Sequence, residues 1–156
     1  MTDTPQIVKT GNFNAAAIHL IIPGRDMASY MDPAIAELLR VIMAQGVTPA
    51  GPLFSFHHRQ PAETFDLEIG FPLTHVIKDR ERVRMITFPA MTVVRALYTG
   101  PYDGLGDAWG RLQEWVRQQG IAESGRFYES YLTNPDDEPD PRKWRTQLNW
   151  IVEMDD

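Results

Sequence analysis

The sequence QGVTPAG at residues 45–51 is matched 74 residues later by QGIAESG at residues 119–125. The segments before these stretches correspond as well, because the apolar residues within 35–42 and within 109–116 have the spacing of one helix face. Gly46 and Gly120 stand where each helix would end, in the position after the C-cap that favours glycine. The pattern indicates two related halves, each with one amphipathic helix.

Strand signals surround each of these helices, so each half reads strand, helix, strand, strand. We expect the first helix to begin at Asp32-Pro33, which has the pattern of an N-cap followed by proline. The expected strands are residues 12–22, 52–57 and 66–73 in the first half, and 92–99, 126–132 and 145–152 in the second.

Neither half has enough elements to bury both faces of a three-stranded sheet, so we expect a single domain over residues 1–156. It comprises repeat one at about 12–74, a charged crossover at 75–84 and repeat two at about 85–154. The predicted fold class is α+β, a tandem strand-helix-strand-strand repeat with pseudo-two-fold symmetry. Two helices would pack on an antiparallel sheet, and the junction of the halves would form a cleft for a ligand.

Composition excludes several classes of function. The 156 residues include no cysteine, which excludes disulfide scaffolds, thiolate metal sites and cysteine nucleophiles. The net charge is −6, without the basic stripe of a nucleic-acid binder. The N-terminal sequence has no signal-peptide pattern, and no apolar run is long enough to span a membrane. We therefore expect a cytoplasmic protein that contacts neither nucleic acid nor membrane.

An acidic group flanked by aromatic rings is the main candidate site. Phe127, Glu129 and Tyr131 alternate along one strand and share one face, which suits an organic cation through charge pairing and cation–π contact. The alternative is that both rings fill the core and Glu129 pairs with an arginine. Glu68 and Gln147 occupy corresponding polar faces of the last strands, so a two-fold axis would place them across a shared site.

Four further stretches resemble the GyrI-like small-molecule-binding family, whose relatives include effector-binding domains of multidrug-sensing transcription regulators. They are TGPY at 99–102, the tryptophan-bearing helix around 109–115, YESYLTNP at 128–135 and WRTQL at 144–148. The resemblance extends from about residue 12 to residue 152. It implies a ligand groove between the halves that takes bulky, aromatic, often cationic molecules.

Many family members carry a ligand-facing glutamate on the closing strand, where this chain has Gln147, so Glu68 and Glu129 would supply the negative charge. The leading hypothesis is a stand-alone protein that sequesters or senses a drug, toxin or metabolite, since the eleven residues before Asn12 leave no room for a helix-turn-helix. The expected ligand-binding residues are Glu68, Tyr98, Phe127, Glu129, Tyr131 and Gln147.

Two other functions stay open. Some relatives hydrolyse cyclopropane-bearing toxins, and here Glu129 or Glu68 would be the general acid or base. Others bind DNA gyrase as a protein partner. No cofactor is expected. No metal site is expected either, because the adjacent His57 and His58 point to opposite faces of a strand and His19 has no partner at ligand spacing.

Overall fold

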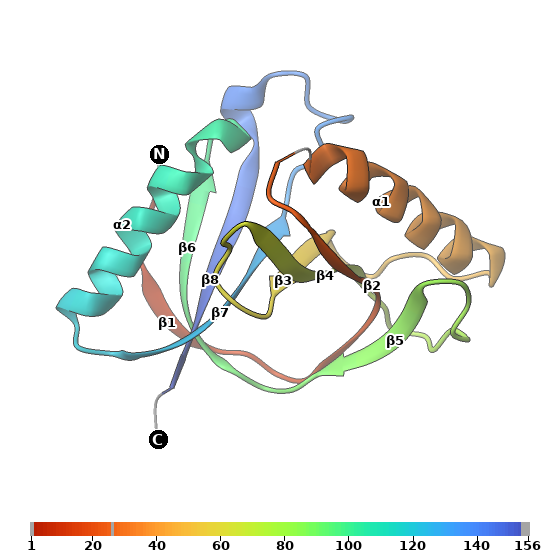
Figure 1. Cartoon of the computed structure of the whole chain (residues 1–156), viewed down its shortest axis with the longest axis horizontal. Helices are drawn as coiled ribbons and strands as arrows, with labels where there is room; N and C mark the ends of the chain where they lie inside the picture. Colours follow the sequence, from red (N-terminus) through yellow and green to blue (C-terminus); the bar gives the residue numbers. More distant parts are fainter. Residues whose placement is uncertain (1, 26, 154–156) are drawn as a thin grey trace.

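The computed structural model describes residues 2–25 and 27–153. Within these residues, eight antiparallel strands form one open sheet in the order β1-β6-β8-β7-β3-β4-β2-β5, accompanied by two α-helices (Figure 1). The strands are β1 (Gln6–Lys9), β2 (Phe13–Pro23), β3 (Phe54–His57), β4 (Thr64–Pro72), β5 (Val83–Phe88), β6 (Thr92–Thr99), β7 (Ala122–Tyr131) and β8 (Arg145–Glu153). The helices are α1 (Met27–Ala44) and α2 (Leu105–Gln118), with 3-10 turns at Tyr102–Gly104 and Pro141–Lys143. The expected α+β class with an antiparallel sheet is confirmed.

Strands β3 and β7 lie side by side in the middle of the sheet, flanked by β4 and β2 on one side and by β8 and β6 on the other. Both helices lie on one face, as the register across the sheet shows. Ile69, in the core under α1, is opposite Ser55, and Ser55 is opposite Glu129. Glu129 is in turn opposite Leu148, in the core under α2. We call this side of the sheet the helix face.

Helix α1 packs on β2, β4 and β5, whereas α2 packs on β6 and β8. The predicted sorting of side chains is confirmed, because Leu67 and Ile69 lie in the core under α1, and Leu148 and Trp150 lie in the core under α2. The opposite face carries a cluster of its own, formed by Ala15, Phe54, Phe56, Phe88, Val93, Tyr128 and Ile151. Within the described residues, no helix is long and apolar enough to cross a membrane.

The prediction that the first helix begins at Asp32-Pro33 is wrong, because α1 begins at Met27 and contains Pro33. The additional turn packs Met27 and Met31 against the core. This burial offsets the loss at Pro33, which has no N–H for the carbonyl four residues earlier. Both helices end as expected before a glycine with positive φ, 75° at Gly46 and 68° at Gly120.

The two edge strands were not predicted from the sequence. β5 begins within the expected crossover at 75–84, and β1 lies before the first expected strand. Both are short, and each forms by pairing with a longer strand, β1 with β6 and β5 with β2. Such edge segments have little periodicity of their own, because the neighbouring strand supplies their hydrogen bonds. The other six strands overlap their predicted ranges.

Candidate functional site

The candidate site lies on the helix face between α1 and α2, over the central strands β3 and β7 (Figure 1). The register places Ser55 opposite Glu129 and His57 opposite Phe127, so all four side chains share this face. Trp109 of α2 reaches the same cluster. Residues from both halves of the chain therefore meet at the middle of the sheet.

A continuous series of hydrogen bonds links these halves. The indole N–H of Trp109 donates to Glu129 Oε1 at 2.9 Å, and the hydroxyl of Tyr131 donates to Glu129 Oε2 at 2.9 Å. The same hydroxyl lies 2.8 Å from Ser55 Oγ, which lies 3.3 Å from His57 Nε2. We call these five residues (His57, Ser55, Tyr131, Glu129 and Trp109) the central hydrogen-bond chain.

Burial governs protonation along the central hydrogen-bond chain. It raises the pKa of Glu129, while hydrogen bonds from Trp109 and Tyr131 act in the opposite direction. Burial, with the nearby charge of His58, lowers the pKa of His57 to about 4, so this imidazole is neutral at neutral pH. Burial and the charge of Glu129 raise the pKa of Tyr131 well above its usual value. Among the residues that the structure describes, the site therefore holds one acidic group and no charged basic group.

Glu129 has hydrogen-bond donors as partners rather than an arginine. In the described part of the chain, no arginine forms an ion pair with it. The alternative is therefore wrong for Glu129 and an arginine, but it is right that Phe127 fills the core, where it is 6% exposed. A carboxyl without a positive partner is free to serve as the counter-charge of a bound cation.

Aromatic rings pack around Phe127 at the inner end of the site. The ring of His57 stacks on Phe127, with centroids 4.4 Å apart and planes 8° apart. Trp109 meets Phe127 edge-on at 4.8 Å, and Trp150 stacks against it at 5.6 Å. These contacts hold the imidazole and the indole that form the two ends of the central hydrogen-bond chain.

A second aromatic group lies nearer the surface. Tyr102 contacts Tyr131 at 5.9 Å and Trp144 at 4.9 Å between ring centroids. Burial raises the pKa of Tyr102, as does the charge of Glu129, so this phenol lies close enough to sense the carboxyl. Tyr102 is 37% exposed, so its ring lies at the outer end of the site, on the side from which a ligand could approach Glu129.

The structure separates the six residues expected to bind ligand. Phe127, Glu129 and Tyr131 come together on the helix face. Tyr98 shares that face but has a structural role, because its buried hydroxyl donates to the Pro101 carbonyl at 2.6 Å. A Cβ at Gly104 would overlap this hydroxyl, so the turn that carries Tyr102 depends on a glycine there.

Glu68 and Gln147 lie on the opposite face of the sheet, away from Glu129. Glu68 is opposite Phe56 in the β3–β4 register, and Gln147 is opposite Ser130 in the β7–β8 register. Gln147 Oε1 accepts a hydrogen bond from Asn149 at 3.2 Å. The acidic group of the central hydrogen-bond chain is therefore Glu129. Glu68 and Gln147, expected to face a shared site, lie on the other side of the sheet from it.

Sequence reasoning did not identify Ser55, His57 or Trp109 as members of the site. The 74-residue offset contained a usable signal, since it relates Ser55 to Glu129 and His57 to Tyr131. In the structure Ser55 and Glu129 are directly opposite each other on adjacent central strands. Two surface hollows of about 540 Å³ each lie elsewhere, one along α2 and one near Met91, and neither includes a residue of the central hydrogen-bond chain.

Comparison with known proteins gives one family. The family described as GyrI-like small molecule binding domain matches residues 3–151 of the chain. No curated protein is significantly similar in sequence.

Solved structures share the fold. The C-terminal domain of EcmrR has a TM-score of 0.87 at 23% identity, covering 97% of this chain and 98% of that domain. EcmrR in a DNA complex has a TM-score of 0.85 at 24% identity over 97% of this chain, which spans only 58% of the EcmrR chain. A hydrolase from Listeria innocua reaches 0.68 at 12% identity, covering 96% of this chain and 91% of that one. SAV2435 bound to tetraphenylphosphonium reaches 0.65 at 12% identity, covering 97% and 94%.

Proposed function

Because the chain belongs to the GyrI-like small-molecule-binding family, we propose that it binds an aromatic organic cation at the central hydrogen-bond chain. One observation carries the proposal: Glu129 is held by Trp109 and Tyr131 among aromatic rings, and none of the described residues places a cation beside it. The cation would become the missing counter-charge. Sequestration or sensing of a drug, toxin or metabolite is the role that follows.

The aromatic rings would supply most of the contact area. A flat or propeller-shaped ligand stacks against Tyr102 and Trp144 at the surface, and its positive centre approaches Glu129. Since Tyr131 is only partly buried, a shift of the Tyr102 and Tyr131 side chains would open the way to the carboxyl. Tetraphenylphosphonium, the ligand in the SAV2435 structure, has this chemistry and is a suitable probe.

Calorimetric titration with tetraphenylphosphonium and with neutral triphenylphosphine oxide tests the proposal. Glu129→Gln keeps the shape of the side chain and removes its charge, so we expect the Kd for the cation to rise roughly tenfold or more. The Kd for the neutral compound should change little. Glu68→Gln is the matched control on the opposite face and should bind the cation like the wild type.

Three results would contradict the proposal. They are no binding of the cation by the wild type, an equal loss of affinity for both compounds in Glu129→Gln, or a larger loss of affinity in Glu68→Gln.

Lowering the pH supplies an independent check. Because the pKa of Glu129 is raised, protonation removes its charge at a higher pH than in an ordinary glutamate. Affinity for the cation should fall with it, while affinity for the neutral compound stays constant.

A hydrolytic function at the same site has one observation in its favour. Glu129 has a raised pKa and accepts a hydrogen bond from Tyr131, an arrangement that suits a general acid acting on a bound electrophile. Mass spectrometry of a strained cyclopropane compound incubated with the protein tests this function. Product formed by the wild type and absent with Glu129→Gln would support hydrolysis. Intact compound in both samples would count against it and leave binding as the function.

A further inference from the structure

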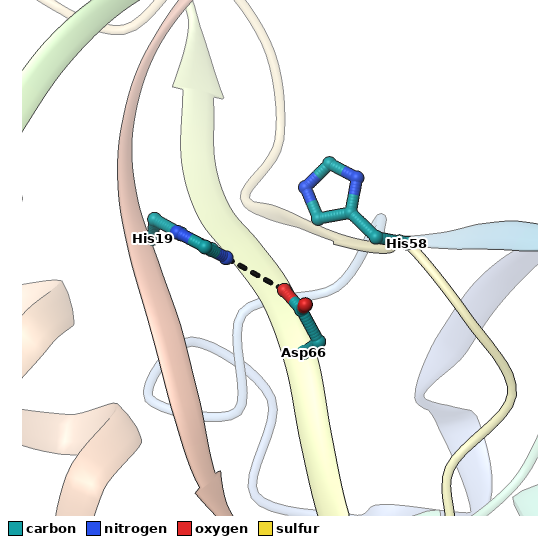
Figure 2. A group of neighbouring side chains, drawn as sticks. All are labelled: His19, His58 and Asp66. Atoms are coloured by element: carbon teal, nitrogen blue, oxygen red, sulfur yellow. Dashed lines mark hydrogen bonds and ion pairs between the residues drawn. The ribbon is translucent and has the colours of Figure 1, made fainter.

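A second cluster of polar side chains lies on the sheet face away from the helices. His19 of β2, Asp66 of β4 and His58, which follows β3, each bring one potential ligand atom to the same place (Figure 2). These nitrogen and oxygen atoms all lie within 4.8 Å of one another. The three residues come from separate segments of the sequence, so pairing of the strands assembles the cluster.

Strand register explains this meeting. His19 is opposite Glu68 across β2 and β4, so Asp66, two residues along β4, lies diagonally across from it on the same face. The backbone N–H of His58 donates to the Asp66 carbonyl at 3.0 Å, which extends the pairing of β3 with β4 past His57. Alternation then directs His58 to the face opposite that of His57.

Hydrogen bonds hold the three side chains near one another, and a bound ion would replace the bond between His19 and Asp66. His19 Nε2 lies 2.6 Å from Asp66 Oδ1, so these two potential ligand atoms are already in contact. His58 Nε2 lies 3.4 Å from one oxygen of Glu68, whose other oxygen is buried without a hydrogen-bond partner. Two carboxylates therefore surround the two imidazoles and favour a positive ion.

We propose that His19, His58 and Asp66 form a binding site for a divalent transition-metal ion of the zinc type. Two imidazole nitrogens and one carboxylate oxygen are typical ligands of Zn²⁺, whereas Ca²⁺ and Mg²⁺ are bound by oxygen atoms alone. Ligand atoms about 2.1 Å from a tetrahedral zinc lie about 3.4 Å apart. Side-chain rotations that move the three ligand atoms by about 1 Å would bring them to this spacing. Side chains of His19 and His58 are 51% and 38% exposed, which leaves them room to rotate and an open path for the ion.

The three ligands would leave the fourth position of the ion to a water molecule. A bound ion would join β2, β4 and the end of β3, on the face opposite the proposed cation site. The two sites use different residues, so each can be abolished without the other. Glu129→Gln is accordingly expected to retain the metal site.

Competition between the protein and a chromogenic chelator for Zn²⁺ tests the proposal. The protein should carry no polyhistidine tag and should be stripped of metal beforehand. We expect the wild type to bind one equivalent, and we expect Asp66→Asn and His58→Gln each to raise the Kd at least tenfold. His75→Gln removes an exposed histidine outside the cluster and should bind like the wild type.

Titration with Co²⁺ provides a second readout, because its visible spectrum reports on the geometry and the donor atoms of the site. The wild type and His75→Gln should give the same spectrum, and Asp66→Asn should lose it. Circular dichroism shows whether each variant is folded. Binding of zinc by Asp66→Asn and His58→Gln with unchanged affinity, or no stoichiometric binding by the wild type, would overturn the proposal.

Discussion

His57 and His58 are neighbours in the chain, yet they belong to opposite faces of the sheet and to different chemical environments. His57 is 5% exposed and stacks on Phe127, and burial lowers its pKa to about 4. The side chain of His58 is 38% exposed and lies beside Glu68. A histidine is thus a neutral hydrogen-bonding group on the helix face, at His57. On the opposite face, at His58, a histidine offers an accessible nitrogen to a ligand.

The carboxyl groups of the two faces differ in the same way. Burial raises the pKa of Glu129, whereas the hydrogen bond from His19 lowers the pKa of Asp66. The two proposals follow this difference, with a large apolar cation that replaces water on the helix face and a small hydrated ion on the opposite face. In both proposals burial, more than residue type, would decide which ligand each face takes, and the following predictions test the difference in burial.

The largest expected effect is the acid sensitivity that His57 gives to the fold. Its pKa falls from 6.5 to about 4 on folding, so its contribution to stability is complete above pH 6.5 and is lost as the pH falls toward 4. A shift of this size corresponds to about 3 kcal/mol. In His57→Gln, urea unfolding should show a free energy of unfolding that depends less on pH across this interval.

His58→Gln is the matched control, one residue away on the other face. It leaves the buried imidazole in place, so most of the pH dependence should remain. Glu129→Gln should make the free energy of unfolding rise more steeply with pH, the opposite of the effect of His57→Gln. The reason is that a glutamate with a raised pKa makes stability fall as the pH rises above 4.5, the ordinary pKa of the group. If His57→Gln and the wild type showed the same pH dependence of unfolding, burial would not govern the protonation of His57.

A smaller effect is expected from Trp109→Phe. This change removes the indole N–H that donates to Glu129 at 2.9 Å and keeps an aromatic ring against Phe127. Loss of a hydrogen bond to a partly buried acidic group should lower the free energy of unfolding by about 2 kcal/mol. Trp115→Phe, on the same helix, is the comparison, and an equal loss in both variants would assign the effect to packing alone.

Much of the fold was predictable from the sequence, because local strand patterns indicated six of the strands and two apolar stripes indicated both helices. The start of α1 was not predictable, because the local signal at Pro33 was overridden by burial of Met27 and Met31. The edge strands β1 and β5 depend on their neighbours and have weak patterns of their own.

The candidate sites were predictable only in part, for a geometric reason. Alternation within one strand groups Phe127 with Glu129, but it does not reveal which face of another strand is shared. Glu68 was therefore grouped with Glu129, although the register separates them. Likewise, His19 and Asp66 are 47 residues apart, and only the β2–β4 pairing brings them together.

The smallest effect on stability is expected from Asp66→Asn. The ion pair with His19 is short at 2.6 Å, but the two side chains are 51% and 26% exposed, so water and salt screen it. Without metal, the free energy of unfolding should change by less than about 1 kcal/mol. Because the pKa of Asp66 is lowered, this contribution is present above its ordinary pKa of 3.8 and is lost as the pH falls further. With saturating Zn²⁺ the wild type should gain stability that Asp66→Asn does not, since the ion binds the folded state. A large loss of stability without metal would show that the carboxylate is instead a structural element of the sheet.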